Sequence, residues 1–129
     1  MADEVKTTPE TKGPTPEKAR ALVDAIEGAE SLAIGTPTLV ETEIVLVSRA
    51  GPTSRGTLAN FVVDRDVEVM PFEEHHWREA ASAFLRFGKG RHPAGLNYGD
   101  CMTYATARLA GEPLLCLGND FALTDLELA

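Results

Sequence analysis

Short apolar runs alternate with segments of helical length along this chain, and this alternation constrains the fold more than any other feature. Apolar runs occupy 32–34 and 114–117, while 67–71 alternates apolar with acidic residues as a strand does. Segments of helical length separate these runs. Strands joined by helices form parallel sheets that are covered on both faces. We therefore predict an α/β fold with a parallel sheet between helices.

Caps, prolines and glycines bound the predicted helices. The first follows Thr15, has Pro16 at its first position and covers 16–27. Residues 1–15 are rich in proline and threonine, which is typical of a polar tail. The sequence thus predicts a tail over 1–15 and one domain over 16–129. The other predicted helices lie between Pro37 and Gly51, over 53–63, over 73–87, and from a cap at Asp100 to Ala110.

Charge and cysteine content exclude several classes of function. The 129 residues carry a formal net charge of −8, which argues against a protein that coats nucleic acid through Lys and Arg. No Ser-His-Asp arrangement, phosphate-binding glycine loop or CxxC motif supports acyl transfer, nucleotide hydrolysis or redox chemistry. The longest uncharged run, 31–40, is too short for a membrane span, and the residues after Met1 do not predict a secretory signal. With Cys101 and Cys116 in apolar surroundings, we expect reduced thiols and a cytoplasmic location.

Acidic residues occupy positions where a parallel sheet gathers ligands. Asp120 follows the run 114–117, and Glu41 lies near the start of the helix that follows the run 32–34. Ligands of open parallel sheets bind at the carboxyl ends of strands, so these acids belong to one edge. Asp100 begins a helix after a glycine-rich loop. Crowded carboxylates repel one another unless a divalent cation neutralises them, and oxygen ligands suit Mg²⁺ or Mn²⁺.

Each acid also has a structural interpretation. Asp is among the best N-caps and stabilises a helix by about 1 kcal/mol, so Asp100 alone is explained as a cap. Asp120, in Gly-Asn-Asp, is explained as a turn residue. Periodicity puts Glu43 near the middle of an apolar helical arc and Glu41 at its margin. A carboxylate beside a core needs a partner, so periodicity alone favours Glu43 over Glu41 as a ligand.

A glycine-rich loop carries the one basic cluster of this acidic chain. Arg86, Lys89 and Arg91 place three of the twelve cations within six residues, next to His92. Such a cluster can guide RNA phosphates, and it is equally well explained as a solvated loop.

The remaining histidines and aromatic residues have structural explanations. His75 and His76 are adjacent on a predicted helix, where side chains diverge, and no third ligand has metal spacing, so we expect both at the surface. Trp77, Phe84 and Phe87 are expected in the core.

Two segments carry a resemblance to a known family: FGKGRHPAGLNYGDCMTYATARLAGEPLLCLGNDFALTD, residues 87–125, and TLVETEIVLVSRAGP, residues 38–52. From 32 to 126 the chain resembles a VapC-type toxin of the PIN-domain ribonuclease family. The resemblance implies a three-layer α/β/α fold and a Mg²⁺- or Mn²⁺-dependent endoribonuclease. It also implies a homodimer, an RNA substrate and a VapB-like antitoxin that blocks the site.

The resemblance implies roles for individual residues. The acids that would hold the cation and carry catalysis are Glu41, Asp100 and Asp120. The residues that would guide the RNA are Lys89 and Arg91. Accessory candidates are Asn97, Thr124 and Asp125, which fall at family-like positions, together with Glu43.

The first residues depart from the family pattern. Members begin with an apolar strand that ends in Asp-Thr-Ser or a similar triplet, which supplies a first metal-binding aspartate and the central strand. Residues 1–14 read MADEVKTTPETKGP and contain neither. Either they fold into the sheet, another chain fills the gap, or the protein is a degenerate member. Two alternatives to a nuclease follow: a catalytically impaired PIN-like module that binds an antitoxin, and an unrelated acidic α/β domain.

Overall fold

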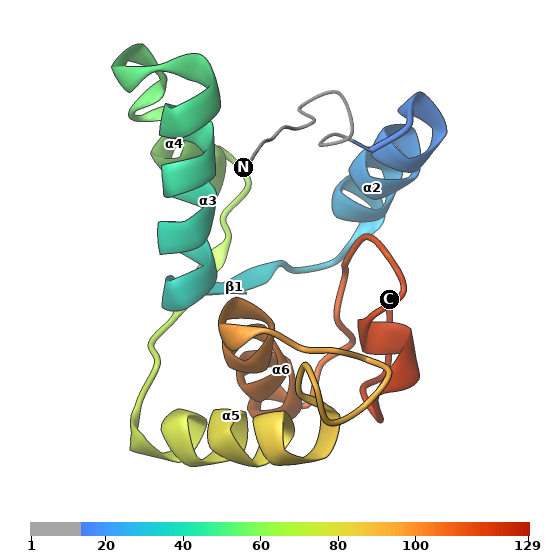
Figure 1. Cartoon of the computed structure of the whole chain (residues 1–129). Coiled ribbons are helices and arrows are strands. Elements are labelled where there is room, and N and C mark those ends of the chain that lie inside the picture. The colour runs from blue at the N-terminus through green and yellow to red at the C-terminus, as the bar shows by residue number, and fades with distance from the viewer. Residues whose placement is uncertain (1–13) are drawn as a thin grey trace, which may run out of the picture.

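The structure is a computed structural model that describes residues 14–129 (Figure 1). The predicted tail over 1–15 lies outside the described residues, apart from Pro14 and Thr15. In chain order the elements are α2 (Pro16–Gly28), β1 (Ala33–Gly35), α3 (Thr36–Ala50), the 3₁₀ turn η2 (Pro52–Ser54), α4 (Thr57–Asp64), β2 (Glu68–Met70), α5 (Glu74–Phe87), α6 (Tyr98–Ala110) and the 3₁₀ turn η3 (Phe121–Leu123).

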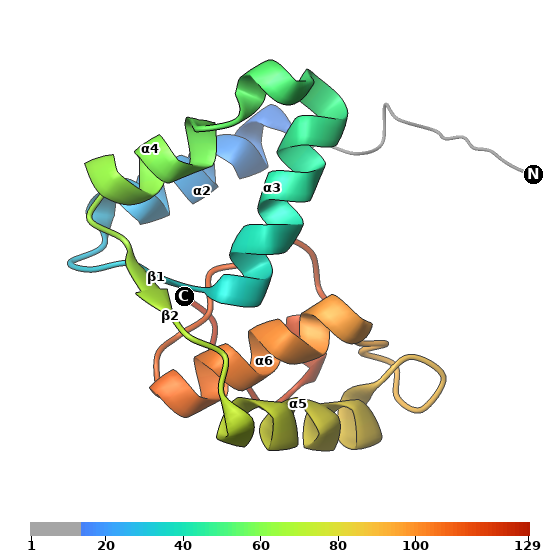
Figure 2. The same ribbon diagram turned by 90° about the vertical axis from the view of Figure 1, so that its left-hand side faces the viewer.

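These elements form three layers. Figure 2 shows α2, α3 and α4 on one side of the two strands and α5 with α6 on the other. β1 and β2 run parallel, with Ala33 opposite Glu68 and Gly35 opposite Met70. The predicted α/β/α fold with a parallel sheet is therefore confirmed.

The apolar run 114–117 does not form the predicted strand. Leu114 makes a single parallel bridge with Leu128, and its N–H donates to the carbonyl of Glu127 at 2.9 Å. This bridge lies outside the β1–β2 sheet, and Leu117 is exposed. Within residues 14–129, β1 has a strand neighbour on one edge only. Because the run 114–117 does not pair with this sheet, its backbone groups have no ladder of hydrogen bonds there. It therefore does not form the buried strand that its composition predicts.

The helices match their predicted bounds where local signals mark them. α2 begins at Pro16 because the hydroxyl of Thr15 accepts a hydrogen bond from the N–H of Lys18 at 3.2 Å. The helix predicted over 53–63 is broken into η2 and α4. Gly56 separates them with a φ of 95°, a left-handed conformation that a continuous helix cannot contain.

The core lies between α5 and α6. Its buried members are Ala80 and Ala83 of α5, Ala94 and Leu96 of the connecting loop, Cys101, Tyr104 and Ala105 of α6, and Phe121. By contrast, α2, α3 and α4 contain no buried residue. The helical layer that carries Glu41 therefore depends on fewer packing contacts than the layer that carries Asp100.

The buried face of α5 differs from the predicted one. Residues at spacings of four and three define it, namely His76, Ala80, Ala83 and Phe87. Trp77 and Phe84 lie beside this face and are 57% and 41% exposed, so their predicted place in the core is wrong. The prediction of two surface histidines is wrong for His76, which is only 6% exposed because it continues the alanine face.

The two cysteines are free thiols. Cys101 is buried and Cys116 is partly buried, and burial raises the pKa of both. Raised pKa values keep both side chains protonated and unreactive at neutral pH. In the part of the chain that the structure describes, no helix combines the length and apolar character that a membrane crossing requires.

Candidate active site

The start of α6 is capped by Asn97, not by Asp100. The N–H of Asp100 donates to Oδ1 of Asn97 at 2.8 Å, and the N–H of Asn97 donates to Oδ2 of Asp100 at 3.1 Å. This reciprocal pair is a capping box. The predicted cap is therefore wrong by one turn, and Asp100 keeps its second carboxylate oxygen free of the box.

Glu41 of α3 lies against the first turn of α6. A methyl group at Gly99 would come within 3.1 Å and 3.2 Å of its two carboxylate oxygens, so the missing side chain at Gly99 makes room for them. A hydrogen bond of 3.2 Å between the hydroxyls of Thr38 and Thr103 holds the same helices together. The positive end of the α6 dipole favours negative charge here. The structure thus places the Glu41 carboxylate against Gly99, the residue before Asp100, a contact that sequence reasoning missed.

Glu43 leaves α3 on the other side. Two residues along a helix turn the side-chain direction by roughly 200°, so Glu41 and Glu43 cannot face α6 together. Glu43 is partly buried and Glu41 is exposed. Geometry therefore favours Glu41 as the acid beside α6, whereas periodicity alone favours Glu43.

Asp120 stands at the turn that leads into η3. Its side chain is exposed, and its backbone carbonyl accepts the N–H of Leu123 at 3.2 Å. Among residues 14–129, one group of three or more His, Cys, Asp or Glu has ligand atoms within 4.8 Å of one another, and it contains none of Glu41, Asp100 and Asp120. The convergence of the three acids stays a prediction, and the contact that supports it is that of Glu41 with Gly99.

That group consists of Glu73, His75 and His76 at the start of α5, so the expectation that the two histidines diverge and lack a third potential ligand is wrong. Nδ1 of His76 accepts the N–H of Glu73 at 3.1 Å, which makes His76 part of a capping box. The rings of His75 and His76 are in tilted contact, with centroids 4.5 Å apart and planes at 39° to each other. We assign this group to helix capping and ring packing.

The chemistry of the acids at α6 fits a hard divalent cation. Glu41, Asp100 and Asp120 offer carboxylate oxygens only, and across residues 14–129 none of them forms an ion pair. Oxygen ligands without a protein cation are the donors that Mg²⁺ and Mn²⁺ prefer.

Asp125 holds the C-terminal segment to the core helices. Its Oδ1 accepts the hydroxyl of Tyr104 at 2.6 Å, and its Oδ2 accepts Arg86 at 2.6 Å and Arg108 at 3.0 Å. Burial raises the pKa of Asp125, but hydrogen bonds from Tyr104 and Arg86 outweigh it and lower this pKa to about 2. We call these four residues the Asp125 clasp.

Structural contacts already engage one residue of the basic cluster and three of the accessory candidates. Arg86 is exposed but engaged by Asp125, so Lys89 and Arg91 are the two residues of the basic cluster without an ion pair among the described residues. The hydroxyl of Thr124 donates to the carbonyl of Phe121 at 2.6 Å, which closes a turn. Thr124 and Asp125 thus have structural contacts, as Asn97 has at its helix cap.

Comparison with known proteins places the chain in a family. A family model for the PIN domain matches residues 14–126. Ribonuclease VapC36 of Mycobacterium tuberculosis is 47% identical over 109 residues, which cover 84% of this chain and 78% of that protein. Ribonuclease VapC28 of the same organism is 38% identical over 112 residues, or 86% and 84% of the two chains. Ribonuclease VapC of Mycolicibacterium smegmatis is 38% identical over 108 residues, 84% of each chain. This chain therefore belongs to the PIN-domain family, within its VapC group.

Proposed function

We propose that this protein is the toxin of a VapBC-type toxin-antitoxin system, an endoribonuclease that cleaves RNA phosphodiesters and depends on Mg²⁺ or Mn²⁺. Its membership of the VapC group supports the reaction class. The observation that carries the proposal is the Glu41 carboxylate lying against Gly99, one residue before Asp100. In this proposal two acids from different helices meet at the first turn of α6, where a divalent cation would neutralise their mutual repulsion.

In this proposal the acids and the basic loop have separate tasks. Glu41, Asp100 and Asp120 hold the cation through carboxylate oxygens. When bound, the cation supplies positive charge that polarises the scissile phosphate and acidifies an attacking water. Lys89 and Arg91 lie in the loop that leads into α6, so they would bind RNA phosphates next to the acids.

The VapC group also supports proposals about partners and place. We propose a VapB-like antitoxin that blocks the acids, a homodimer, and the cytoplasm as the compartment where RNA is met. Experiments with Mn²⁺ and RNA on the isolated protein do not depend on the antitoxin, the homodimer or the compartment.

The test is single-turnover cleavage of structured RNA with Mg²⁺ or Mn²⁺, comparing wild type with Asp100→Asn. Asparagine keeps an oxygen acceptor for the α6 capping box but removes the negative charge. We expect a loss of roughly 100-fold or more, the scale for removing a group that stabilises transition-state charge. Equal cleavage by both proteins would remove Asp100 from the mechanism.

The alternative is a catalytically impaired PIN-like protein that acts as an antitoxin-binding module. One observation favours it: residues 1–14 lack the family's first-aspartate motif. Calorimetric titration with Mn²⁺ separates the two proposals. A nuclease predicts binding heat that Asp120→Asn abolishes, whereas a binding module predicts no heat at millimolar Mn²⁺.

The third interpretation, an unrelated acidic α/β domain, is wrong. The PIN-domain match covers residues 14–126, which is nearly the whole described chain.

A further inference from the structure

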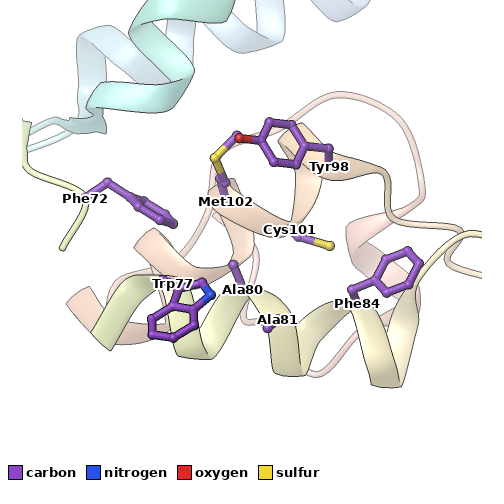
Figure 3. A pocket seen from close by; sticks show the side chains of 8 residues that line it. All are labelled: Phe72, Trp77, Ala80, Ala81, Phe84, Tyr98, Cys101 and Met102. Atoms are coloured by element: carbon purple, nitrogen blue, oxygen red, sulfur yellow. The ribbon is translucent and has the colours of Figure 1, made fainter. Parts of the chain in front are cut away.

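An apolar groove runs between α5 and α6, outside the acids assigned above. Its volume is about 380 Å³. Figure 3 shows Trp77 and Phe84 projecting from α5, Tyr98 and Met102 from α6, and alanines of α5 between them. Phe72 adjoins Trp77 at one end.

The aromatic rings of this groove are unusually open to solvent. Tyr98 is 82% exposed, more than either Trp77 or Phe84. Flat, exposed rings are the surfaces on which proteins stack the bases of single-stranded nucleic acid. Packing does not require Tyr98, because the buried face of α6 is formed by Cys101, Tyr104 and Ala105.

Arginines flank the groove on α5 and on the loop that follows it. The guanidinium of Arg78 lies 4.8 Å from the ring centroid of Trp77, and that of Arg91 lies 6.0 Å from the ring centroid of Phe84. Both arginines are exposed, but Arg78 already pairs with Glu74 at 2.7 Å. Arg91, by contrast, has no ion pair among the described residues and donates only its Nε–H, to the carbonyl of Leu85 at 3.3 Å. An RNA strand fits this arrangement, because its bases can contact the rings while a phosphate contacts the remaining donors of Arg91. An apolar partner helix would bury the same rings but would desolvate the Arg91 charge without replacing its water.

One side of the groove is formed by the first turn of α6, which also carries Asp100. Tyr98 is the first residue of α6 and stands between the cap residue Asn97 and Gly99, which Glu41 contacts. A base stacked on Tyr98 therefore has its phosphate at the end of the helix where Glu41 and Asp100 lie.

We propose that this groove is a base-binding subsite: it takes one unpaired RNA base that flanks the cleaved phosphodiester, so the RNA must be single-stranded there. The position of the cut in this statement rests on the proposed ribonuclease function. The recognition of an unpaired base does not rest on that function, because RNA binding is measured without cleavage.

Trp77 is the only tryptophan of the chain, so tryptophan fluorescence reports on the groove alone. The probe is an unstructured RNA oligonucleotide titrated into the full chain with excess chelator, which prevents cleavage. We expect saturable quenching of Trp77. An abasic oligonucleotide of the same length and a duplex RNA should quench little, because neither presents an unpaired base.

Variants separate stacking from folding. Tyr98→Ala should weaken RNA binding roughly 10-fold, the scale of one base stacked on one ring, whereas Tyr98→Phe keeps the ring and should bind as wild type does. Leu85→Ala is the matched control, because Leu85 is exposed on α5 but does not line the groove. Equal binding of abasic and normal RNA, or equal affinity of the Ala and Phe variants, would overturn the proposal.

A second copy of the chain in the groove would give a different result. If Trp77 fluorescence instead changes with protein concentration, and Tyr98→Ala dissociates a dimer, a second copy covers the groove and the proposal fails. Base-dependent quenching without any cleavage in Mn²⁺ would support the subsite and contradict the nuclease. Cleavage that Tyr98→Ala leaves unchanged would support the nuclease and contradict the subsite.

Discussion

Asp125 shows how little a residue's neighbours in sequence can indicate about its role. Its three partners, Tyr104, Arg86 and Arg108, lie 17 to 39 positions away, so no local pattern predicts the clasp. Glu41 is a similar case. Its contact with Gly99 depends on the packing of α3 against α6, whereas helical periodicity around it favours Glu43. For both residues the family resemblance indicated a position, and only the fold supplied the contacts.

The Asp125 clasp predicts a pH-dependent contribution to stability. The folded pKa of about 2 lies below the ordinary 3.8, so the ionised carboxylate stabilises the fold above about pH 4 and loses this contribution as the pH falls toward 2. Because the Asp125 side chain is 36% exposed, solvent screening reduces the expected effect of Asp125→Asn to roughly 1 kcal/mol.

Urea denaturation at several pH values measures this difference between wild type and Asp125→Asn. We expect it to be full at pH 6 and to shrink below about pH 4. Asp24→Asn is the control, because Asp24 is an exposed acid of α2 that has no ion pair in the described chain. A difference that stays constant across this range would contradict the role of the carboxylate charge.

Substitution of Gly99 should weaken metal binding without lowering the stability of the fold. In Gly99→Ala the new methyl group would displace the Glu41 carboxylate, and alanine favours the helix. We expect Mn²⁺ affinity to fall about 10-fold while the unfolding temperature is unchanged or higher. Calorimetry and thermal unfolding measure the two effects. Gly28→Ala is the control, because nothing lies within 4 Å of its added methyl, and equal Mn²⁺ affinity of both variants would refute the contact.

At the scale of elements, predictions succeeded where local chemistry sets the boundary. The Thr15-Pro16 start places α2, and the left-handed Gly56 explains why one predicted helix became two elements. Predictions failed where contacts with another residue or segment determine the structure. The run 114–117 has strand composition but a partner for one residue only, and α6 begins earlier than predicted because Asn97 competes successfully for the cap.

The Asn97 cap predicts a measurable cost. Asn97→Ala removes the side-chain acceptor for the N–H of Asp100 and should lower the free energy of unfolding by about 1 kcal/mol. Asn97→Ser restores a capping oxygen and should recover most of the loss. Chemical denaturation of the three proteins measures this. If the serine variant is as unstable as the alanine variant, the capping box is not what stabilises the start of α6.

At the scale of the whole molecule, packing is uneven. Every buried apolar residue lies in α5, α6 or the segments joined to them, and the layer of α2, α3 and α4 has none. Composition could not reveal this, because α3 and α4 are as apolar as core helices.

This unevenness predicts uneven hydrogen exchange. Amides of α5 and α6 should exchange more slowly than those of α2 and α4, because helices with few buried contacts open at a lower free energy. Exchange followed by mass spectrometry measures the difference on the full chain. Uniform protection of the α-helices within residues 14–129 would mean that the two layers open together.

The proposed function requires that an acid of α3 and an acid of α6 act on RNA together at one cation. Single-turnover RNA cleavage in Mn²⁺ by Glu41→Gln and Glu43→Gln tests it most directly, because the two residues lie on the same helix and point in opposite directions. We expect the cleavage rate to fall roughly 100-fold for Glu41→Gln and to stay at the wild-type level for Glu43→Gln. Full activity of Glu41→Gln would contradict it.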